Sequence, residues 1–473
     1  MSARWKTWLL LCAAGAVAGC AHYQPQPLSP AQTAAEFERR QLTSRPLKDF
    51  LAKEAGQPPA QWPLAKWDIN SLTLAAFYYH PDLAVARAQW RVAQAGITTA
   101  GARPNPSVTF TPAYDNQIPN NPSPWIFPVT FDIPLEIAGK HAKRIAEAEQ
   151  AAESARWNYV SAAWQIRSGV RAALLEYGLA GRRAELLQKQ FAAQSEMVKL
   201  MQGRFKAGAV ARTEVTTVQI ALSKTQQDLN DAQSKRSEAR SRLAQAIGVP
   251  LEALDGVKLQ FDFSAGTNRL SAREARAIAL RSRADVLGAL ADYAAAEADL
   301  RLQVARQYPD LHLGPGYAWN SGNAGDNQWS LGATIELPIL DQNQGPIAEA
   351  TARRKLSAAK FAALQAQVSA EIDRAAAGVQ VAREQLETGR KLIAAQHQQQ
   401  EFAEAQFKAG AGERLDVLAA QVEAGSAAVA QLDNEIKLQT ALGALEDAVQ
   451  QPSQNFDVLK IITSQMEPKQ SKP

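Results

Sequence analysis

The chain has 473 residues, of which 46% are hydrophobic and 21% are charged, a balance that excludes a disordered protein. Its mean hydropathy of −0.27 excludes a polytopic helical membrane protein, and a net charge of +4 spread along the chain does not indicate nucleic-acid binding. Both cysteines, Cys12 and Cys20, lie at the N-terminus, so the rest of the chain holds neither a disulfide framework nor a cysteine metal cluster.

The N-terminus has the pattern of an export signal. Arg4 and Lys6 precede an apolar run over residues 8–17, which is too short for a stable membrane span. The run leads into the letters VAGC, which resemble the bacterial lipobox, so Cys20 would be the lipidated first residue of the mature chain. Its acyl chains, at about 0.8 kcal/mol per buried methylene, would anchor it stably. Ala21 follows in place of the Asp that retains lipoproteins at the inner membrane, which favours the outer membrane; a plain signal peptide is the alternative.

One unit of sequence occurs twice in the chain. The letters RFKAGA at residues 204–209 return as QFKAGA at residues 406–411, 202 positions later, and residues 132–135 match residues 336–339. We therefore expect an internal tandem repeat. The predicted segments are a lipoprotein signal peptide (1–19), an N-terminal anchor or equatorial segment (20–70), a first repeat (71–270), a second repeat (271–452) and a C-terminal tail (453–473).

Each repeat should contain, in order, a helical stretch, two strands and a long helical hairpin. Two long regions without proline are rich in the strong helix formers Ala, Gln, Glu, Lys and Leu, and each is interrupted once, at Gly208 or Gly410. A helix over residues 140–206 would span about 100 Å, so it needs neighbours in a bundle or barrel. The expected helical stretches are 71–102 and 271–306, and the expected hairpins are 140–206 with 213–249 and 346–408 with 414–450.

Four stretches alternate between apolar and polar residues, as β-strands do. They are residues 107–114, 125–133, 310–319 and 328–337. Their lengths suit tilted transmembrane strands, although a half-buried sheet in a soluble domain is the alternative. Open strand edges do not occur in lipid, so four strands must be pooled between copies of the chain. Two copies would supply 8 strands and three copies 12, and the residues alone do not choose between these numbers.

These features together resemble the TolC-type outer-membrane efflux channels over residues 20–452. The run from Asp132 to Lys140, with Ala138 in place of the first of two glycines, and the letters NPS at residues 105–107 resemble the heavy-metal/RND subgroup. The resemblance implies a mainly α fold with a transmembrane β-barrel. It further implies a homotrimer that pools its strands into a 12-stranded barrel in the outer-membrane lipid, above a long α-helical barrel in the periplasm.

The same resemblance implies a passive exit duct of a tripartite efflux system, which carries metal ions or drugs. The implied partners are a periplasmic adaptor (membrane fusion) protein and an inner-membrane RND-type pump. A type I protein-secretion channel would have the same fold. A lipid-anchored periplasmic coiled-coil scaffold is a further alternative, which the strand alternation disfavours.

The sequence offers no constellation for catalysis or metal binding. No two of the five histidines are three or four residues apart, and there is no phosphate-binding loop, dinucleotide fingerprint or nucleophile elbow. We therefore expect neither an enzyme nor a cofactor, a metal site or a nucleic-acid partner.

The repeated turns are the first candidate site. The resemblance places them at the periplasmic tip, so Lys206, Gly208, Lys408 and Gly410 are expected to contact the adaptor. The alternative is purely structural, since glycine after a helix end closes the last turn in the left-handed conformation.

The second candidate site is a gate beside these turns, formed by Glu214, Arg414, Leu415 and Asp416. An acid in the first turn of a helix gains about 0.3–1 kcal/mol from the helix dipole, which by itself can explain Glu214 and Asp416. In a symmetric duct, however, each acid would form a ring that favours cations. Leu415 would supply an apolar constriction, and Arg414 would pair with an acid to hold the tip closed.

Overall fold

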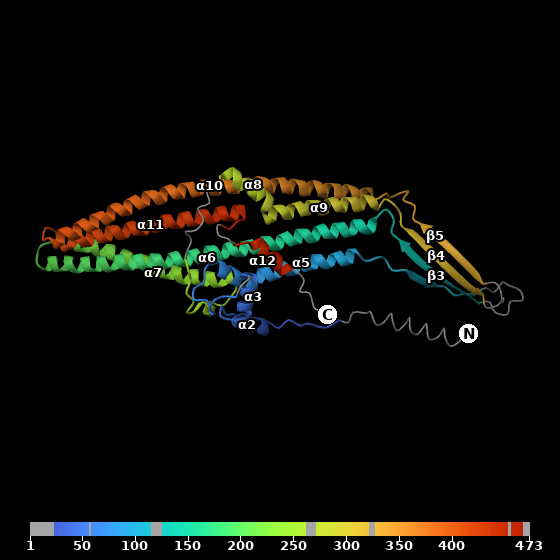
Figure 1. The fold of residues 1–473 in the computed structure, drawn as a ribbon, viewed down its shortest axis with the longest axis horizontal. Coiled ribbons are helices and arrows are strands. Elements are labelled where there is room, and N and C mark those ends of the chain that lie inside the picture. The colour runs from blue at the N-terminus through green and yellow to red at the C-terminus, as the bar shows by residue number, and fades with distance from the viewer. Residues whose placement is uncertain are drawn as a thin grey trace.

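The computed structural model describes residues 23–55, 58–114, 125–261, 271–320, 327–452 and 456–466. The signal segment 1–19 and Cys20 lie outside these residues. The described chain is an elongated bundle of helices that ends in a small antiparallel sheet (Figure 1). The predicted class, mainly α with a β part, is confirmed. None of the described helices is both long and apolar enough to cross a membrane.

Four long helices form two hairpins. They are α6 (Lys140–Lys206) with α7 (Arg212–Ile247), and α10 (Gln344–Lys408) with α11 (Arg414–Val449). Helix α6 packs against α7 on one side and α11 on the other, and α10 packs against α11. The lateral order is therefore α7–α6–α11–α10, which leaves α7 and α10 at the edges of this layer.

The helical stretch that opens each repeat is divided into two helices. The first consists of α4 (Ile69–Tyr79) and α5 (Pro81–Ala100), and the second of α8 (Ala272–Ser282) and α9 (Ala284–Ala305). His80 and Arg283 lie at the two breaks in extended conformation, with ψ of 125° and 130°. At the first break the cause is local, because the residue before a proline is disfavoured in the helical region.

A group of shorter elements, which we call the collar, lies beside the middle of the bundle. It consists of α2 (Pro30–Glu38), α3 (Arg45–Ala55), α4, the 3₁₀ turn η1 (Leu251–Leu254) and α12 (Val458–Met466) (Figure 1). Two of these elements, α4 and α12, contact α6. Buried side chains such as Trp67, Leu72 and Tyr159 form the largest apolar core of the described chain there. Ser464 donates a 2.7 Å hydrogen bond to Glu54, so segments from opposite ends of the chain meet in this collar.

The sheet contains β1 (Ser107–Phe110), β2 (Ala113–Tyr114), β3 (Trp125–Leu135), β4 (Leu311–Asn320) and β5 (Gln328–Ile335). The strands are antiparallel in the order β1–β3–β4–β5, and β2 also pairs with β3. The stretch 107–114, expected as one strand, is thus divided in two. The interruption falls at Pro112, which has no N–H to donate to the ladder.

The two faces of the sheet differ in character. Register pairs Phe127 with Trp319 and Tyr317 with Trp329, so the apolar side chains of three strands share one face. Trp329 and Leu331 on this face are 84% and 78% exposed. No layer of the described protein covers these side chains, which disfavours the soluble half-buried sheet and suits a face in contact with lipid.

Candidate functional site

The tip, which we define as the turns 207–211 and 409–413, lies at the end of the bundle opposite the sheet (Figure 1). The two turns have the same geometry. Gly208 and Gly410 have φ of 76° and 72°. In the first turn the N–H of Gly208 donates to Phe205 and that of Ala209 to Arg204, and the second turn repeats both bonds. This is the Schellman ending of a helix, so the structure gives both glycines a conformational role.

The tip is well exposed. Lys206, Lys408 and both glycines are exposed, and Phe205 and Phe407, which could have packed inside the hairpins, are 44% and 41% exposed. The structure therefore brings the four expected adaptor-contact residues to one solvent-facing end. Two aromatic rings lie beside them, as is common where a protein binds a partner.

The two gate acids act as helix caps. The carboxylate of Glu214 accepts a 3.0 Å bond from the N–H of Ala211, and that of Asp416 accepts a 3.0 Å bond from the N–H of Glu413. Each acid thus satisfies a free amide at the start of its own helix. Asp416 is exposed, and Leu415 is half-buried. The capping contacts supply the structural explanation for both acids.

Arg414 makes the pairing that its position suggested, and its partner is Glu196 of α6. Two N–H groups of its guanidinium donate to the two carboxylate oxygens over 3.0 and 3.1 Å. Arg204, in the last turn of α6, pairs with Glu413 at the start of α11. These two ion pairs connect the first hairpin to the second beside the tip. The sequence contained no local signal for Glu196, Arg204 or Glu413, because their partners are more than two hundred positions away.

Polar contacts continue along the seam, our name for the α6–α11 interface. Arg183 pairs with Asp433 at 2.6 Å, and Arg182 pairs with Glu435 at 2.8 Å. Apolar clusters lie inside the hairpins, and Arg242 of α7 also pairs with Glu176 of α6 at 2.5 Å. Leu187 packs near Leu229 and Ala232 between α6 and α7, and a smaller cluster of Ala403, Val417 and Ala420 lies between α10 and α11. The hairpins are therefore held internally mainly by packing, whereas several ion pairs recur where the two hairpins meet.

The collar end of the seam is buried. Arg167 and Glu446 form an ion pair in which both side chains are at most 4% exposed. Next to them, Ser168 donates a 2.5 Å hydrogen bond to Asp447. Burial raises the pKa of Asp447, although the bond from Ser168 opposes that shift. Breaking a buried pair costs about 3–5 kcal/mol, whereas an exposed pair contributes about 0–1 kcal/mol. The seam is thus held firmly at the collar and weakly at the tip.

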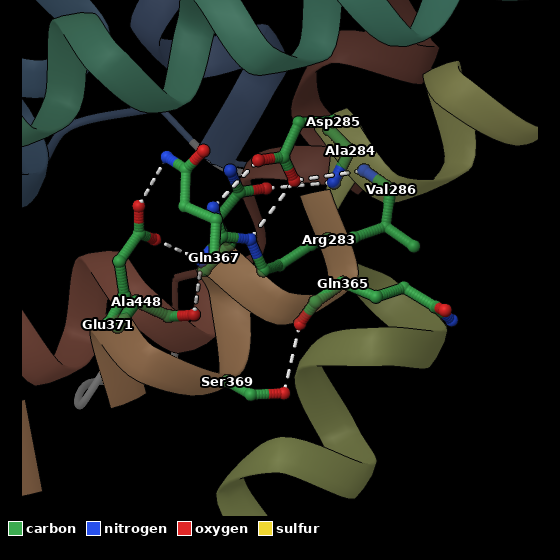
Figure 2. Close-up of polar contacts among 10 residues, drawn as sticks. Arg283, Ala284, Asp285, Val286, Gln365, Gln367, Ser369, Glu371 and Ala448 are labelled. Atoms are coloured by element: carbon green, nitrogen blue, oxygen red, sulfur yellow. Dashed lines mark hydrogen bonds and ion pairs between the residues drawn. The ribbon is translucent and has the colours of Figure 1, made fainter. Parts of the chain in front are cut away.

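A second arginine joins the helices of the second repeat near the collar. Arg283, at the break between α8 and α9, donates to both oxygens of Asp285 at 3.0 and 2.7 Å, to Glu371 at 3.0 Å and to the carbonyl of Ala448 at 2.8 Å (Figure 2). Since Glu371 belongs to α10 and Ala448 to α11, this guanidinium connects the break to the second hairpin. Within the described ranges, no group of three or more His, Cys, Asp or Glu side chains is placed to hold a metal ion.

Comparison with known proteins identifies the family. The model of the family described as "Outer membrane efflux protein" matches residues 76–249 and 276–449, which is more than half of the chain. The chain belongs to this family. It is an outer-membrane efflux channel, a passive protein and not an enzyme, with its helices in the periplasm. Channels of this family work in tripartite systems with an adaptor and an inner-membrane pump.

Individual relatives are distant. The cobalt-zinc-cadmium resistance protein CzcC of Cupriavidus metallidurans is 24% identical over 345 residues, which cover 72% of this chain and 79% of CzcC. The pyoverdine export outer membrane protein OpmQ of Pseudomonas aeruginosa is 22% identical, over 59% of this chain and 62% of OpmQ.

Solved channel structures share the fold. The outer-membrane channel OprN superposes with a TM-score of 0.67 at 19% identity, covering 92% of this chain and 99% of OprN. CusC has a TM-score of 0.65 at 18% identity, covering 90% of this chain and 98% of CusC. The open state of MtrE from Neisseria gonorrhoeae has a TM-score of 0.63 at 17% identity, covering 81% of this chain and 89% of MtrE.

Proposed function

We propose that three copies of this chain close around one axis into a continuous duct. The observation that carries this proposal is a sheet with an uncovered apolar face and two open edges, β1 and β5. In lipid those edges must pair, and only further copies of the sheet can supply the missing strands. Three copies supply 12 strands, counting β1 and β2 as one. The helical layer supports the same assembly, because its edge helices α7 and α10 are free to pack against the edge helices of neighbouring copies.

The cargo we propose is a metal ion or a drug, delivered by an RND-type inner-membrane pump through a periplasmic adaptor. Of the two relatives compared above by sequence, the metal-resistance protein CzcC matches the larger share of this chain, which puts metal ions first. The relative OpmQ exports pyoverdine, so the family also carries organic solutes.

We assign the tip two roles in this duct. Lys206, Gly208, Lys408 and Gly410 would form the surface that meets the adaptor. The neighbouring Glu214, Arg414, Leu415 and Asp416 would form the gate, in which the Arg414–Glu196 pair holds the tip closed. The exposure of the turns and the weakness of exposed ion pairs support these roles.

The segment boundaries complete the proposal. We keep the signal peptide at 1–19, the anchor or equatorial segment at 20–70, the repeats at 71–270 and 271–452, and the tail at 453–473. Lipidation of Cys20 would anchor the mature N-terminus in the outer membrane. Mass spectrometry of that N-terminus should show acyl mass on Cys20, and an unmodified N-terminus at Ala21 would contradict the anchor.

Two experiments test the duct. Native mass spectrometry of detergent-solubilised protein should give a trimer, and a dimer, or a monomer soluble without detergent, would refute the assembly. Deleting the gene should sensitise cells to metal ions or drugs. Loss of one secreted protein with unchanged resistance would instead indicate a protein-secretion channel. If deletion changes neither resistance nor protein secretion, and the protein carries no current in planar bilayers, the protein would be a scaffold.

A further inference from the structure

The two helical hairpins correspond to each other position by position. Helices α7 and α11 both have 36 residues and begin 202 positions apart, and α6 and α10 end 202 positions apart. At the same offset, buried side chains of α6 recur as buried side chains of α10. Examples are Ile166 and Val368, Val170 and Ile372, Ala173 and Ala375, Ala184 and Leu386, and Met201 and Ala403. Helix α10 is therefore the counterpart of α6, and α7 is the counterpart of α11.

This correspondence predicts what covers the two edges of the helical layer. Inside the chain, α6 packs against α11 to form the seam, whereas α7 and α10 lie at opposite edges of the layer (Figure 1). In a ring of copies, α10 of one copy meets α7 of the next, which is the counterpart of α6 meeting α11. The register of the seam therefore supplies a register for the contact between copies.

The ion pairs of the seam do not recur at these edges. The four pairs that lie on the tip side of the collar are Arg204–Glu413, Glu196–Arg414, Arg183–Asp433 and Arg182–Glu435. In the same order, their counterparts at the offset of 202 are Gln406 and Ala211, Gln398 and Arg212, Gln385 and Asp231, and Glu384 and Gln233. None of these four combinations joins a cation to an anion, and all eight residues are exposed in the single chain.

Arg212, at the start of α7, illustrates the difference. Its counterpart Arg414 makes two bonds to Glu196, whereas the residue that corresponds to Glu196 is Gln398. Arg212 is exposed and forms no ion pair with any residue that the structure describes. The side-chain carbonyl of glutamine can accept a hydrogen bond from a guanidinium but carries no charge. The partner that this register offers to Arg212 is therefore neutral.

We propose that adjoining copies meet through α10 and α7 in the register of the seam but without its ion pairs, so that Gln398 accepts a hydrogen bond from Arg212 of the neighbouring copy. In the same register Leu392, which is 50% exposed in the single chain, lies beside Ser223 of the neighbouring copy. Two kinds of contact then alternate around the duct, with ion pairs within each copy and uncharged contacts between copies. Salt screens exposed ion pairs, so it weakens the first kind more than the second. This inference rests on the proposed trimeric duct.

Pairs of cysteines test the register. A Cβ atom at Gly425 would lie 3.5 Å from the Cβ of Gln190 across the seam, and the counterparts of these residues are Ser223 and Leu392. Oxidation of the full-length protein with Leu392→Cys and Ser223→Cys should therefore link neighbouring copies, so that most of it runs as covalent trimers on a denaturing gel. Leu392→Cys with Thr216→Cys moves one cysteine seven residues, about 10 Å, along α7 and should leave single chains. Gln190→Cys with Gly425→Cys should also leave single chains, because its bond closes within one copy.

Charge substitutions at Gln398 test the missing ion pair. Gln398→Glu should supply a salt bridge to Arg212 of the neighbouring copy, and so lower the open fraction of the Arg414→Ala channel in dilute KCl by up to about fivefold. Gln398→Lys in the parent channel should instead raise the open fraction, because two cations then face each other. Both effects should disappear in 1 M KCl and when Arg212→Ala is added.

The outcomes separate this contact from the duct itself. Assembled trimers that form no link through the cysteine at residue 223 would overturn the register. Charge effects at Gln398 that are absent, or that survive Arg212→Ala, would overturn the contact between Gln398 and Arg212. A protein that native mass spectrometry shows as single chains would instead refute the duct.

Discussion

Glu196 of α6 and Arg414 of α11 are 218 positions apart in the chain, yet their side chains form a two-bond ion pair beside the tip. Both side chains are more than 40% exposed, and so is Glu413 in the adjoining pair with Arg204. Exposed pairs contribute about 0–1 kcal/mol each, so the contacts that join the hairpins at the tip are weak. Hairpins that are firmly packed inside and weakly joined at the tip can separate there at little cost.

Arg414→Ala should open the tip. The substitution removes both hydrogen bonds to Glu196 while leaving the Asp416 cap intact. We expect a higher single-channel conductance in planar bilayers and a fall in the free energy of unfolding of at most about 1 kcal/mol.

Arg182→Ala is the matched control, because Arg182 also makes one exposed ion pair across the seam but lies farther from the tip. It should leave the conductance unchanged. Equal conductance of the Arg414 variant and the parent would show that the gate lies elsewhere.

A disulfide across the seam should lock the tip. A Cβ atom at Gly425 would lie 3.5 Å from the Cβ of Gln190, which is within the disulfide range of about 3.5–4.5 Å. We therefore expect Gln190→Cys with Gly425→Cys to form a bond when oxidised. In the Arg414→Ala background, oxidation should lower the conductance to that of the closed parent. Reduction of the disulfide should return the conductance to the higher value of the Arg414→Ala variant.

A disulfide within one hairpin provides the comparison. A Cβ atom at Gly378 would lie 3.9 Å from the Cβ of Ala441, which joins α10 to α11 rather than to α6. Oxidising Gly378→Cys with Ala441→Cys should leave the conductance unchanged. If both disulfides reduce the current equally, opening does not involve separation along the seam.

Two double variants distinguish the contribution of charge at the tip to adaptor binding from that of turn geometry. Lys206→Ala with Lys408→Ala removes two exposed cations without changing the backbone, so adaptor binding measured by surface plasmon resonance should weaken while the melting temperature stays constant. Gly208→Ala with Gly410→Ala places side chains at positive φ, which costs about 1–2 kcal/mol per site, so this variant should also melt earlier. Normal adaptor binding by both variants would remove the tip from the adaptor interface.

Asp447 should make the folded protein less stable as the pH rises. Burial raises its folded-state pKa above the ordinary value of 3.8, so between these two values the folded protein binds more protons than the unfolded chain. Stability is then lost as the pH rises through that window. Asp447→Asn should raise the melting temperature at neutral pH, and the difference from the parent should shrink on acidification.

Asp433→Asn is the control for this pH effect, because Asp433 lies on the same helix in a more exposed pair with Arg183. It should lower the melting temperature slightly or leave it unchanged at neutral pH. If Asp447→Asn raises the melting temperature equally at acid pH, ionisation of Asp447 is not the cause of the effect.

Short-range sequence patterns predicted most of the long helices and strands. Residues 140–206 were predicted as one helix, and α6 has the same bounds, because its ends are marked by the glycines at 139 and 208 and its interior lacks proline. Alternation likewise predicted β3, β4 and β5 to within two residues at each end. The breaks at His80 and Arg283 were not predicted, although Pro81 was a local signal for the first of them.

The sequence by itself determined the helices, the strands, the turn glycines and the caps, because each of these depends on residues within a few positions of one another. Only the tertiary structure decided which charges meet. The chain has 51 Lys and Arg and 47 Asp and Glu residues, and on long helices many of them are interchangeable by type and spacing. Pairs such as Arg414–Glu196, Arg167–Glu446 and His312–Asp132 depend on the register in which elements more than a hundred residues apart pack, and that register is set by the summed side-chain packing of the whole bundle.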